Sequence, residues 1–305
     1  MRRLRPLLLA LALLMLGTVA AAPRVAPIHA LFYQPQLADR ALPAARWPAL
    51  FASVRARGFD TLVVQWVQYG DGFTAPADRA WLRTRLDEAR GSGLQLVLGL
   101  AADPAFFQRQ ADAPEAVAGY LHGLAQRDVA VAAQWQSLLG ASAIAGWYLP
   151  LEIDDQHWRA PGARRALTDA LAQEVRGLRA LAPVRPVYVT AFFSGRMAPA
   201  AYAQLLADVH ATGVRVWVQD GAGTAQLEAA ERALYLAAAD GCAGSPGQGR
   251  VHEIFAQVPG QAAFAAQALP AAALDAALAQ RTPCEGDRAV FELRYLPEAA
   301  ELLRR

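Results

Sequence analysis

The segment from residue 146 to 155 reads Gly-Trp-Tyr-Leu-Pro-Leu-Glu-Ile-Asp-Asp and combines aromatic side chains with carboxylates. Its apolar part is typical of a short buried strand, which ends at Glu152 with Asp154 and Asp155 close behind. In an α/β barrel such a strand opens into a loop on the C-terminal face, where active sites lie. This position favours a chemical role for Glu152, whereas Asp155 is equally suited to capping the next helix.

A second carboxylate, Glu253, lies in another apolar run that predicts a strand. Glycoside hydrolysis requires two carboxyl groups flanking the scissile bond, because one protonates the departing oxygen while the other attacks the anomeric carbon or activates water. We expect Glu152 to act as general acid/base and Glu253 as nucleophile or base. For Glu253 the competing interpretation is a salt bridge inside the barrel.

Polar and aromatic side chains stand where other predicted strands end. Aromatic rings stack on the C–H faces of sugars while amides and carboxylates bond to hydroxyl groups, so this mixture is typical of a carbohydrate site. We predict as substrate contacts Tyr33, Gln34, Gln65, Trp66, Tyr148, Asp154, Gln219 and Asp220. Two of them have structural alternatives, since Asp220 begins an Asp-Gly turn sequence and Tyr33 is suited to filling the barrel mouth.

The order of elements supplies a scaffold that gathers strand ends. Apolar strand-like runs alternate with amphipathic helical runs, the pattern of repeated βα units and a parallel sheet. Strands are predicted at residues 28–33, 61–66, 94–100, 144–151, 187–192, 214–218, 250–255 and 289–293. A helix is predicted around Trp47 and further helices at 76–90, 114–139, 163–181, 199–211, 226–238 and 267–279. No change of composition divides residues 22–305, which we interpret as a single (β/α)8 TIM barrel of the α/β class.

The first 21 residues have the layout of a secretory signal peptide. Basic residues at positions 2, 3 and 5 precede an apolar run from Pro6 to Leu16 and small residues up to Ala22. The run is shorter than the roughly 20 residues of a spanning helix, which argues against a membrane anchor. We expect a periplasmic or secreted protein without stable membrane insertion after cleavage.

Export makes the two cysteines informative. Cys242 and Cys284 each lie in a loop before a predicted strand. An oxidising compartment permits a disulfide between them, and neighbouring loops would place it on the N-terminal face of the barrel. Two free thiols are the alternative.

Other classes of function find little support in the 305 residues. The net charge is +2 and the arginines are scattered, so no nucleic-acid surface is indicated. The five histidines show no metal-binding spacing and no nucleophile elbow surrounds any serine. The run Gly221–Gln226 lacks the third glycine of a dinucleotide loop. We therefore expect neither metal nor cofactor.

Taken together, these motifs resemble the DUF4434 family, uncharacterised bacterial proteins grouped with TIM-barrel glycoside hydrolases. The resemblance covers most of the mature chain and is carried by Phe32-Tyr33-Gln34-Pro35, Gly58-Phe59-Asp60-Thr61 with Gln65-Trp66, Leu98-Gly99-Leu100, Gly146-Trp147-Tyr148-Leu149-Pro150 with Glu152, Gln219-Asp220-Gly221 with Gly223, and Glu253 with Phe255. It implies a (β/α)8 fold and glycosidase-like chemistry, with Glu152 and Glu253 at the family's carboxylate positions. The sequence departs from the larger retaining-hydrolase pattern at Leu151, where an Asn would contact the 2-hydroxyl of the sugar.

The function predicted from these features is hydrolysis of a polysaccharide, such as a bacterial exopolysaccharide or cell-wall glycan, by an exported enzyme. Two alternatives stay open. One is a non-catalytic barrel that binds polysaccharide during glycan export or assembly. The other is a structural envelope protein with an occluded barrel mouth.

Overall fold

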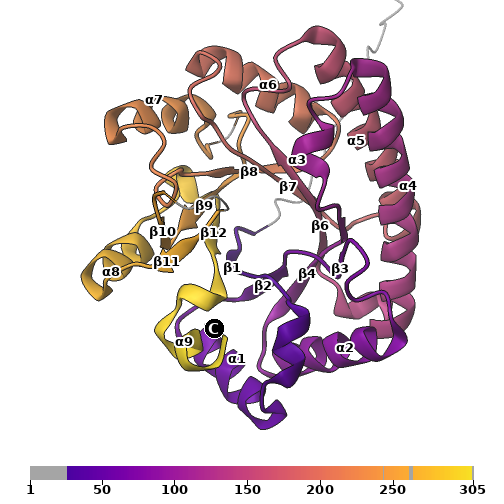
Figure 1. Cartoon of the computed structure of the whole chain (residues 1–305), viewed down its shortest axis with the longest axis vertical. Helices are drawn as coiled ribbons and strands as arrows, with labels where there is room; N and C mark the ends of the chain where they lie inside the picture. Colours follow the sequence, from indigo (N-terminus) through magenta and orange to yellow (C-terminus); the bar gives the residue numbers. More distant parts are fainter. Residues whose placement is uncertain (1–25, 243, 261–263, 304–305) are drawn as a thin grey trace, which may run out of the picture.

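The computed structural model describes residues 26–242, 244–260 and 264–303, and the predicted signal peptide lies outside them. Eight parallel strands close into a barrel that the helices surround (Figure 1). In order around the barrel they are β2 (Thr61–Val64), β4 (Gln95–Gly99), β6 (Gly146–Ile153), β7 (Val187–Ala191), β8 (Arg215–Gln219), β9 (Gly249–Glu253), β12 (Asp287–Phe291) and β1 (His29–Tyr33). The predicted (β/α)8 fold is confirmed.

Helices connect successive strands around the outside of the barrel. They are α1 (Trp47–Ala56), α2 (Pro76–Gly91), α3 (Phe106–Arg109), α4 (Pro114–Leu139), α5 (Pro161–Leu181), α6 (Pro199–Ala211), α7 (Ala229–Ala239), α8 (Ala271–Ala279) and α9 (Pro297–Leu303). Five of them, α2, α4, α5, α6 and α9, begin with a proline, whose fixed φ and missing N–H suit the first turn. Within the described ranges, no helix combines the length and apolarity needed to cross a bilayer.

Short elements complete the loops. The described part of the chain contains five 3-10 helices, η1 (Leu37–Ala41), η2 (Ala44–Arg46), η3 (Ala141–Ala143), η4 (Pro283–Glu285) and η5 (Leu293–Tyr295). Two small sheets extend beyond the barrel strands: β3 (Gln68–Tyr69) pairs with β5 (Ala101–Ala102), and β10 (Phe255–Gln257) pairs with β11 (Ala266–Ala268). Both sheets follow the carboxyl ends of barrel strands. They therefore help to form the rim of the C-terminal end of the barrel, which we call the mouth.

Alternation along the strands divides the core into two layers. Side chains that point outward pack with the helices, while those that point inward form a separate cluster in the barrel. The inner cluster consists of Ala30, Phe32, Val63, Val97, Tyr148, Tyr188, Trp217, Val251 and Ala289. Continuing the same alternation toward the mouth brings Gln65, Glu152, Gln219 and Glu253 to the inner side of their strands.

The predicted boundaries are wrong at two places on the β9 side. The barrel strand ends at Glu253, and Phe255 instead begins β10. The predicted helix at residues 267–279 starts too early, because residues up to Ala268 pair antiparallel with β10. Pro270 explains the late helix start, since proline disfavours helical backbone at the residue before it.

Cys242 and Cys284 form the predicted disulfide, with their Cα atoms 4.9 Å apart. The bond joins the segments that lead into β9 and β12, and so lies at the N-terminal end of the barrel. Among the described residues, the group with metal-ligand geometry consists of these cysteines and Asp240. Because both sulfurs belong to the disulfide, this group does not offer thiolate ligands.

Candidate active site

Glu152 reaches the mouth through an irregularity in β6. The pairing between β6 and β7 runs regularly up to Leu149, and then shifts so that Glu152 lies opposite Thr190. Pro150, which has no N–H to donate to the ladder, lies in the shifted part. Leu151 and Ile153 are buried while Glu152 is partly exposed. The irregularity therefore aims one carboxylate at the mouth from an otherwise buried strand.

The surroundings of Glu152 favour its protonated form. Burial raises the pKa of Glu152 to about 7, and a hydrogen bond from the Gln219 side chain acts in the opposite direction. Tyr148 lies deeper on the same strand, and its pKa is raised by burial and by the charge of Glu152. The Tyr148 hydroxyl is 2.9 Å from Thr190 Oγ1. Tyr148 thus forms part of the floor beneath Glu152 rather than an open contact.

Glu253 is held in place by a loop from the neighbouring strand. It is the last residue of β9 and only 4% exposed. The backbone N–H of Gly223 donates to Glu253 Oε2 at 2.7 Å, and the backbone N–H of Thr224 donates to the same carboxyl group. Burial raises the pKa of Glu253 to about 8, and the negative charges of Asp220 and Glu152 contribute to this rise. The hydrogen bonds from the two backbone amides act in the opposite direction and lower this pKa.

The two carboxyl groups interact, because the charge of Glu152 raises the pKa of Glu253. Their strands, β6 and β9, stand three places apart in the ring of eight. With pKa values raised to about 7 and about 8, both carboxyl groups titrate around neutral pH. Such a pair can hold one proton, which gives an acid and a base in the same site.

Asp220 is a scaffold residue behind Glu253. Its Oδ1 accepts hydrogen bonds from the backbone N–H of Ala222 at 3.0 Å and of Glu253 at 3.3 Å. Its Oδ2 lies 3.5 Å from Nδ1 of the fully buried His252. At 6% exposure, Asp220 is therefore placed to hold the turn and the strand end, not to contact a substrate directly.

Gly223 is essential to this arrangement because a side chain does not fit there. A Cβ on Gly223 would lie 2.6 Å from two ring atoms of Phe255, whose ring also packs on Phe291 and Tyr295. We predict that Gly223→Ala lowers kcat at least about tenfold and unfolding stability by about 1–3 kcal/mol. Turnover and urea unfolding measure the two effects. Gly119→Ala is the matched control, since a Cβ there meets nothing within 4 Å; equal behaviour of the two variants contradicts the prediction.

Several predicted contacts are placed differently by the structure. Tyr33 points away from the barrel interior, packs against Trp47 and donates to Asp39 Oδ2 at 2.9 Å. Tyr33 is fully buried there, so it is removed from the candidate site.

Asp154 and Asp155 organise loops. Asp154 is 3% exposed and accepts hydrogen bonds from Gln110 and from the backbone and ring of His157. Asp155 is fully buried and binds the backbone N–H groups of Ser194 and Arg196. With their oxygens occupied, neither is available to a substrate.

The remaining predicted contacts lie at or near the mouth. Gln65 is 7% exposed and its Oε1 has no hydrogen-bond partner. Gln34 is partly exposed and donates its backbone N–H to Glu292 Oε2 at 3.0 Å. The indole N–H of Trp66 donates to the Pro35 carbonyl at 3.0 Å. Gln65 therefore has spare capacity to accept a hydrogen bond at the mouth.

Glu292 was not predicted and is a third acid at a strand end. It directly follows β12 and is 1% exposed. Burial raises the pKa of Glu292 to about 8, while Arg294 opposes this. The sequence contains the same sign that marks Glu152, an apolar run ending in an acid. A predicted strand that runs to residue 293 places Glu292 inside the strand, whereas β12 ends at Phe291 and leaves Glu292 at its end.

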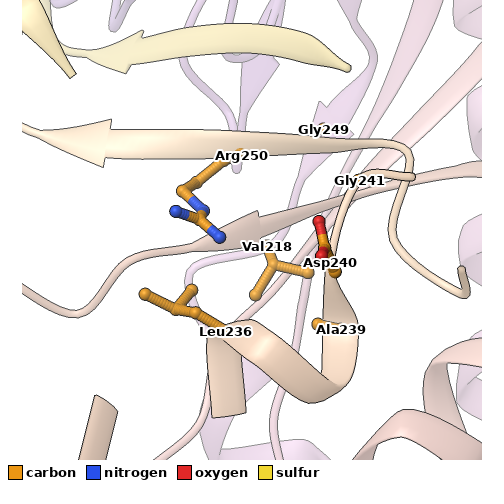
Figure 2. A pocket seen from close by; sticks show the side chains of 7 residues that line it. All are labelled: Val218, Leu236, Ala239, Asp240, Gly241, Gly249 and Arg250. Carbon is orange, nitrogen blue, oxygen red and sulfur yellow. The ribbon is translucent and has the colours of Figure 1, made fainter. Parts of the chain in front are cut away.

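A separate hollow lies on the helix side of the barrel wall. Val218, Gly249 and Arg250 line it from the strands, and Leu236, Ala239, Asp240 and Gly241 from α7 and the residues after it. Figure 2 shows the Arg250 side chain extending from β9 toward α7. Arg250 alternates with the inward-pointing Val251, so the hollow lies outside the barrel and is no part of the mouth.

The model of the family described as "Domain of unknown function (DUF4434)" matches residues 28–300. The chain belongs to the DUF4434 family. The "Uncharacterized protein YbcH" of Escherichia coli (strain K12) is 41% identical over 274 residues, which are 90% of this chain and 92% of YbcH. The predicted resemblance is confirmed.

Solved structures of glycoside hydrolases share the fold of this DUF4434 protein. A putative α-L-fucosidase from Bacteroides thetaiotaomicron VPI-5482 matches with a TM-score of 0.62 at 14% identity, covering 94% of this chain and 95% of that one. A GH18 chitinase from Pseudoalteromonas aurantia matches with a TM-score of 0.51 at 9% identity, covering 90% and 97%. At these identities the likeness shows the barrel fold alone.

Proposed function

We propose that this protein is an exported glycoside hydrolase that cleaves a polysaccharide with Glu152 and Glu253. The observation that carries the proposal is the pair of interacting carboxyl groups at the ends of β6 and β9, both with a raised pKa. The fold shared with glycoside hydrolases supports a carbohydrate substrate. Export is supported by the signal-like N-terminus and by the disulfide, which an oxidising compartment stabilises.

In the proposed reaction, Glu152 donates its proton to the departing glycosidic oxygen. With pKa values of about 7 for Glu152 and about 8 for Glu253, the one-proton state that carries its proton on Glu152 is the minor one, and the reaction draws on that form. Glu253, held by the amides of Gly223 and Thr224, acts as the carboxylate that attacks the anomeric carbon or activates water. Gln219 steadies the Glu152 carboxylate after its proton has left.

The proposal is tested by incubating the purified mature chain with bacterial exopolysaccharides and cell-wall glycans and measuring new reducing ends. We expect release by the native chain and none by a Glu152→Gln, Glu253→Gln double variant. If both proteins bind a glycan and neither cleaves it, the protein is instead a polysaccharide-binding barrel. If neither protein binds or cleaves any glycan, both functions are refuted.

The acid pair predicts a pH optimum near neutrality. Below the lower apparent pKa both carboxyl groups are protonated and no base is present, while above the higher one both are ionised and no acid is present. With values of about 7 for Glu152 and about 8 for Glu253, we expect a narrow bell-shaped profile of kcat/KM. Initial rates across the pH range measure it.

A variant of Gln219 sharpens this prediction. Because the Gln219 hydrogen bond lowers the pKa of Glu152, Gln219→Leu should raise that pKa and move the acid limb of the profile to higher pH. Gln136→Leu serves as a control, since Gln136 lies on α4 away from the mouth. A native optimum near about pH 4, where unperturbed carboxyl groups titrate, contradicts the proposed pair.

A further inference from the structure

His252 is a fully buried imidazole whose polar atoms have no hydrogen-bond partner. It lies on β9 between Val251 and Glu253, which both face the inner side of the barrel, so its ring points outward behind the barrel wall. The residue is 0% exposed, and neither Nδ1 nor Nε2 takes part in a hydrogen bond. Buried polar atoms are almost always paired, because an unpaired one costs folding free energy. Two such atoms on one ring therefore indicate a use other than packing.

Asp220 connects this ring to Glu253. The Asp220 Oδ2 lies 3.5 Å from His252 Nδ1, which is within the range of an ion pair although the two atoms are not hydrogen-bonded. The other oxygen, Oδ1, accepts a hydrogen bond from the backbone N–H of Glu253. The Asp220 carboxylate thus contacts the imidazole on one side and the candidate base's own backbone on the other. A change of charge on His252 acts on the same carboxylate whose charge acts on Glu253.

A second charge on β9 also reaches Asp220. Arg250, two residues before His252, points to the same side of the strand, and its charge interacts with Asp220 and with Asp240. A guanidinium keeps its charge at every working pH, so Arg250 offsets a constant part of the Asp220 charge. Histidine is the side chain that gains and loses a proton near neutral pH. By residue type, His252 is therefore the member of this cluster whose charge can change there.

The elements on the other sides of His252 oppose Asp220 only weakly. On the β12–β1 side stand Arg288 and His29. Burial and the charge of Arg288 lower the pKa of His29, and His252 is the weakest of the causes that act on it. Helix α8 packs against β9, and its charged residue, Asp275, is exposed to solvent. Asp220, in contact at 3.5 Å, is thus the charge that most strongly favours a proton on His252.

The proposed reaction requires its proton on one particular acid. Glu152 must be protonated while Glu253 is ionised. With pKa values of about 7 for Glu152 and about 8 for Glu253, the proton resides more often on Glu253. After burial, the charge of Asp220 is the largest cause that raises the pKa of Glu253. A positive charge beside Asp220 offsets this cause and so favours the arrangement that the reaction needs.

We infer that His252 and Asp220 form a titratable pair that decides which of the two acids holds the proton: a proton on His252 neutralises Asp220, so that Glu253 ionises while Glu152 keeps its proton. The exchange is balanced, because one proton leaves Glu253 and one is bound by His252. His252 acts through Asp220 and does not touch the substrate, so it is a positioning residue. The inference rests on the proposed function and adds a means of regulating its site by pH.

The first test follows the Glu253 carboxyl group directly, without any substrate. The full mature chain is labelled with ¹³C at the glutamate carboxyl carbons and titrated by NMR, and the Glu253 signal is identified by its loss in Glu253→Gln. We expect His252→Gln to move the midpoint of the Glu253 titration upward by about one pH unit, because the compensating charge is gone. His210→Gln, the same change at an exposed residue of α6, is the control without effect. An unchanged midpoint in His252→Gln overturns the inference.

Asp220→Asn tests whether the effect passes through Asp220. The asparagine keeps one oxygen for the backbone N–H groups of Ala222 and Glu253 and removes the charge. We expect the Glu253 midpoint to fall. Adding His252→Gln should then change nothing, since a buried imidazole without a counter-charge stays neutral. A shift of equal size in both backgrounds refutes Asp220 as the connection.

A reciprocal measurement keeps His252 in place, so it does not depend on the folding of a His252 variant. Two linked groups affect each other equally, and ionised Glu253 should therefore favour the proton on His252. Titration of ¹⁵N-labelled histidine, with His252 assigned through its bonds to the backbone, should show a lower midpoint in Glu253→Gln than in the native chain. A ring that stays neutral from about pH 5 to about pH 9, or a midpoint that Glu253→Gln leaves unchanged, contradicts the inference.

Turnover separates this inference from the proposed function. On a glycan that the native chain cleaves, His252→Gln should lower the maximum of kcat/KM by about fivefold and move its low-pH limb upward, and adding Asp220→Asn should restore both. Cleavage without coupled titrations refutes the inference and leaves the hydrolase. Coupled titrations in a chain that cleaves no glycan support the control of the proton and refute the hydrolase.

Discussion

Glu152→Gln is expected to lower kcat/KM on a polysaccharide by about 10²–10⁴-fold, because the departing sugar oxygen then receives no proton. The loss should depend on the leaving group. An aryl glycoside that leaves as a stable phenolate needs little protonation, so the same variant should retain far more of its activity on that substrate. Parallel kinetics on the polymer and on an aryl glycoside of the same sugar measure the difference.

Glu253→Gln is the matched comparison. The attacking or water-activating carboxylate is needed whatever group departs, so this variant should lose activity on both substrates. If the polymer-specific loss occurs in Glu253→Gln and the general loss in Glu152→Gln, the two roles are reversed. Equal activity of both variants and the native chain would remove the acid pair from the mechanism.

The stability of Glu152→Gln should move in the opposite direction from its activity. Burial raises the folded-state pKa of Glu152 from 4.5 to about 7. As pH rises through this window the unfolded chain releases its proton before the folded chain does, so folding stability falls, by up to roughly 3 kcal/mol above pH 7. The glutamine does not ionise, so the variant should resist urea better than the native chain at pH 8 and equally well at pH 4. A variant that is inactive because it misfolds should instead resist urea less well than the native chain.

The fold was predictable because each barrel strand is a short apolar run and most helices begin at a proline. Local signals of this kind do not depend on distant contacts. The boundaries that failed depend on pairing with other segments. Residues 266–268 are helix-like in composition but pair with β10. The strand β12 ends at Phe291, although the apolar Leu293 follows just after Glu292.

The candidate site was predictable only to the level of the strand ends. Which side of a strand a residue faces depends on register, and for this reason Tyr33 was expected at the mouth although it packs against Trp47 outside the barrel. The sequence leaves the role of Asp220 undecided, because an Asp-Gly turn has the same residues whether its carboxylate binds a substrate or the backbone. Contacts such as that of Gly223 with Glu253 join two strands and have no signature in a single sequence.

The disulfide gives the largest expected effect on stability. Replacing Cys242 and Cys284 by serine removes a crosslink between residues 42 positions apart. A loop of this length corresponds to a loss of up to about 4 kcal/mol of unfolding free energy, because the unfolded chain regains the freedom that the bond had restricted. For a chain of this size that lowers Tm by roughly 10 °C, which differential scanning calorimetry measures.

The same double variant separates the two ends of the barrel. The disulfide joins the segments before β9 and β12, whereas Glu253 ends β9 at the opposite face. Residues on the N-terminal face of such barrels serve stability and those on the C-terminal face serve chemistry. At a temperature where the variant is fully folded, we therefore expect its kcat/KM to equal that of the native chain. A large loss of turnover in the folded variant would show that the crosslink also sets the position of Glu253 through β9.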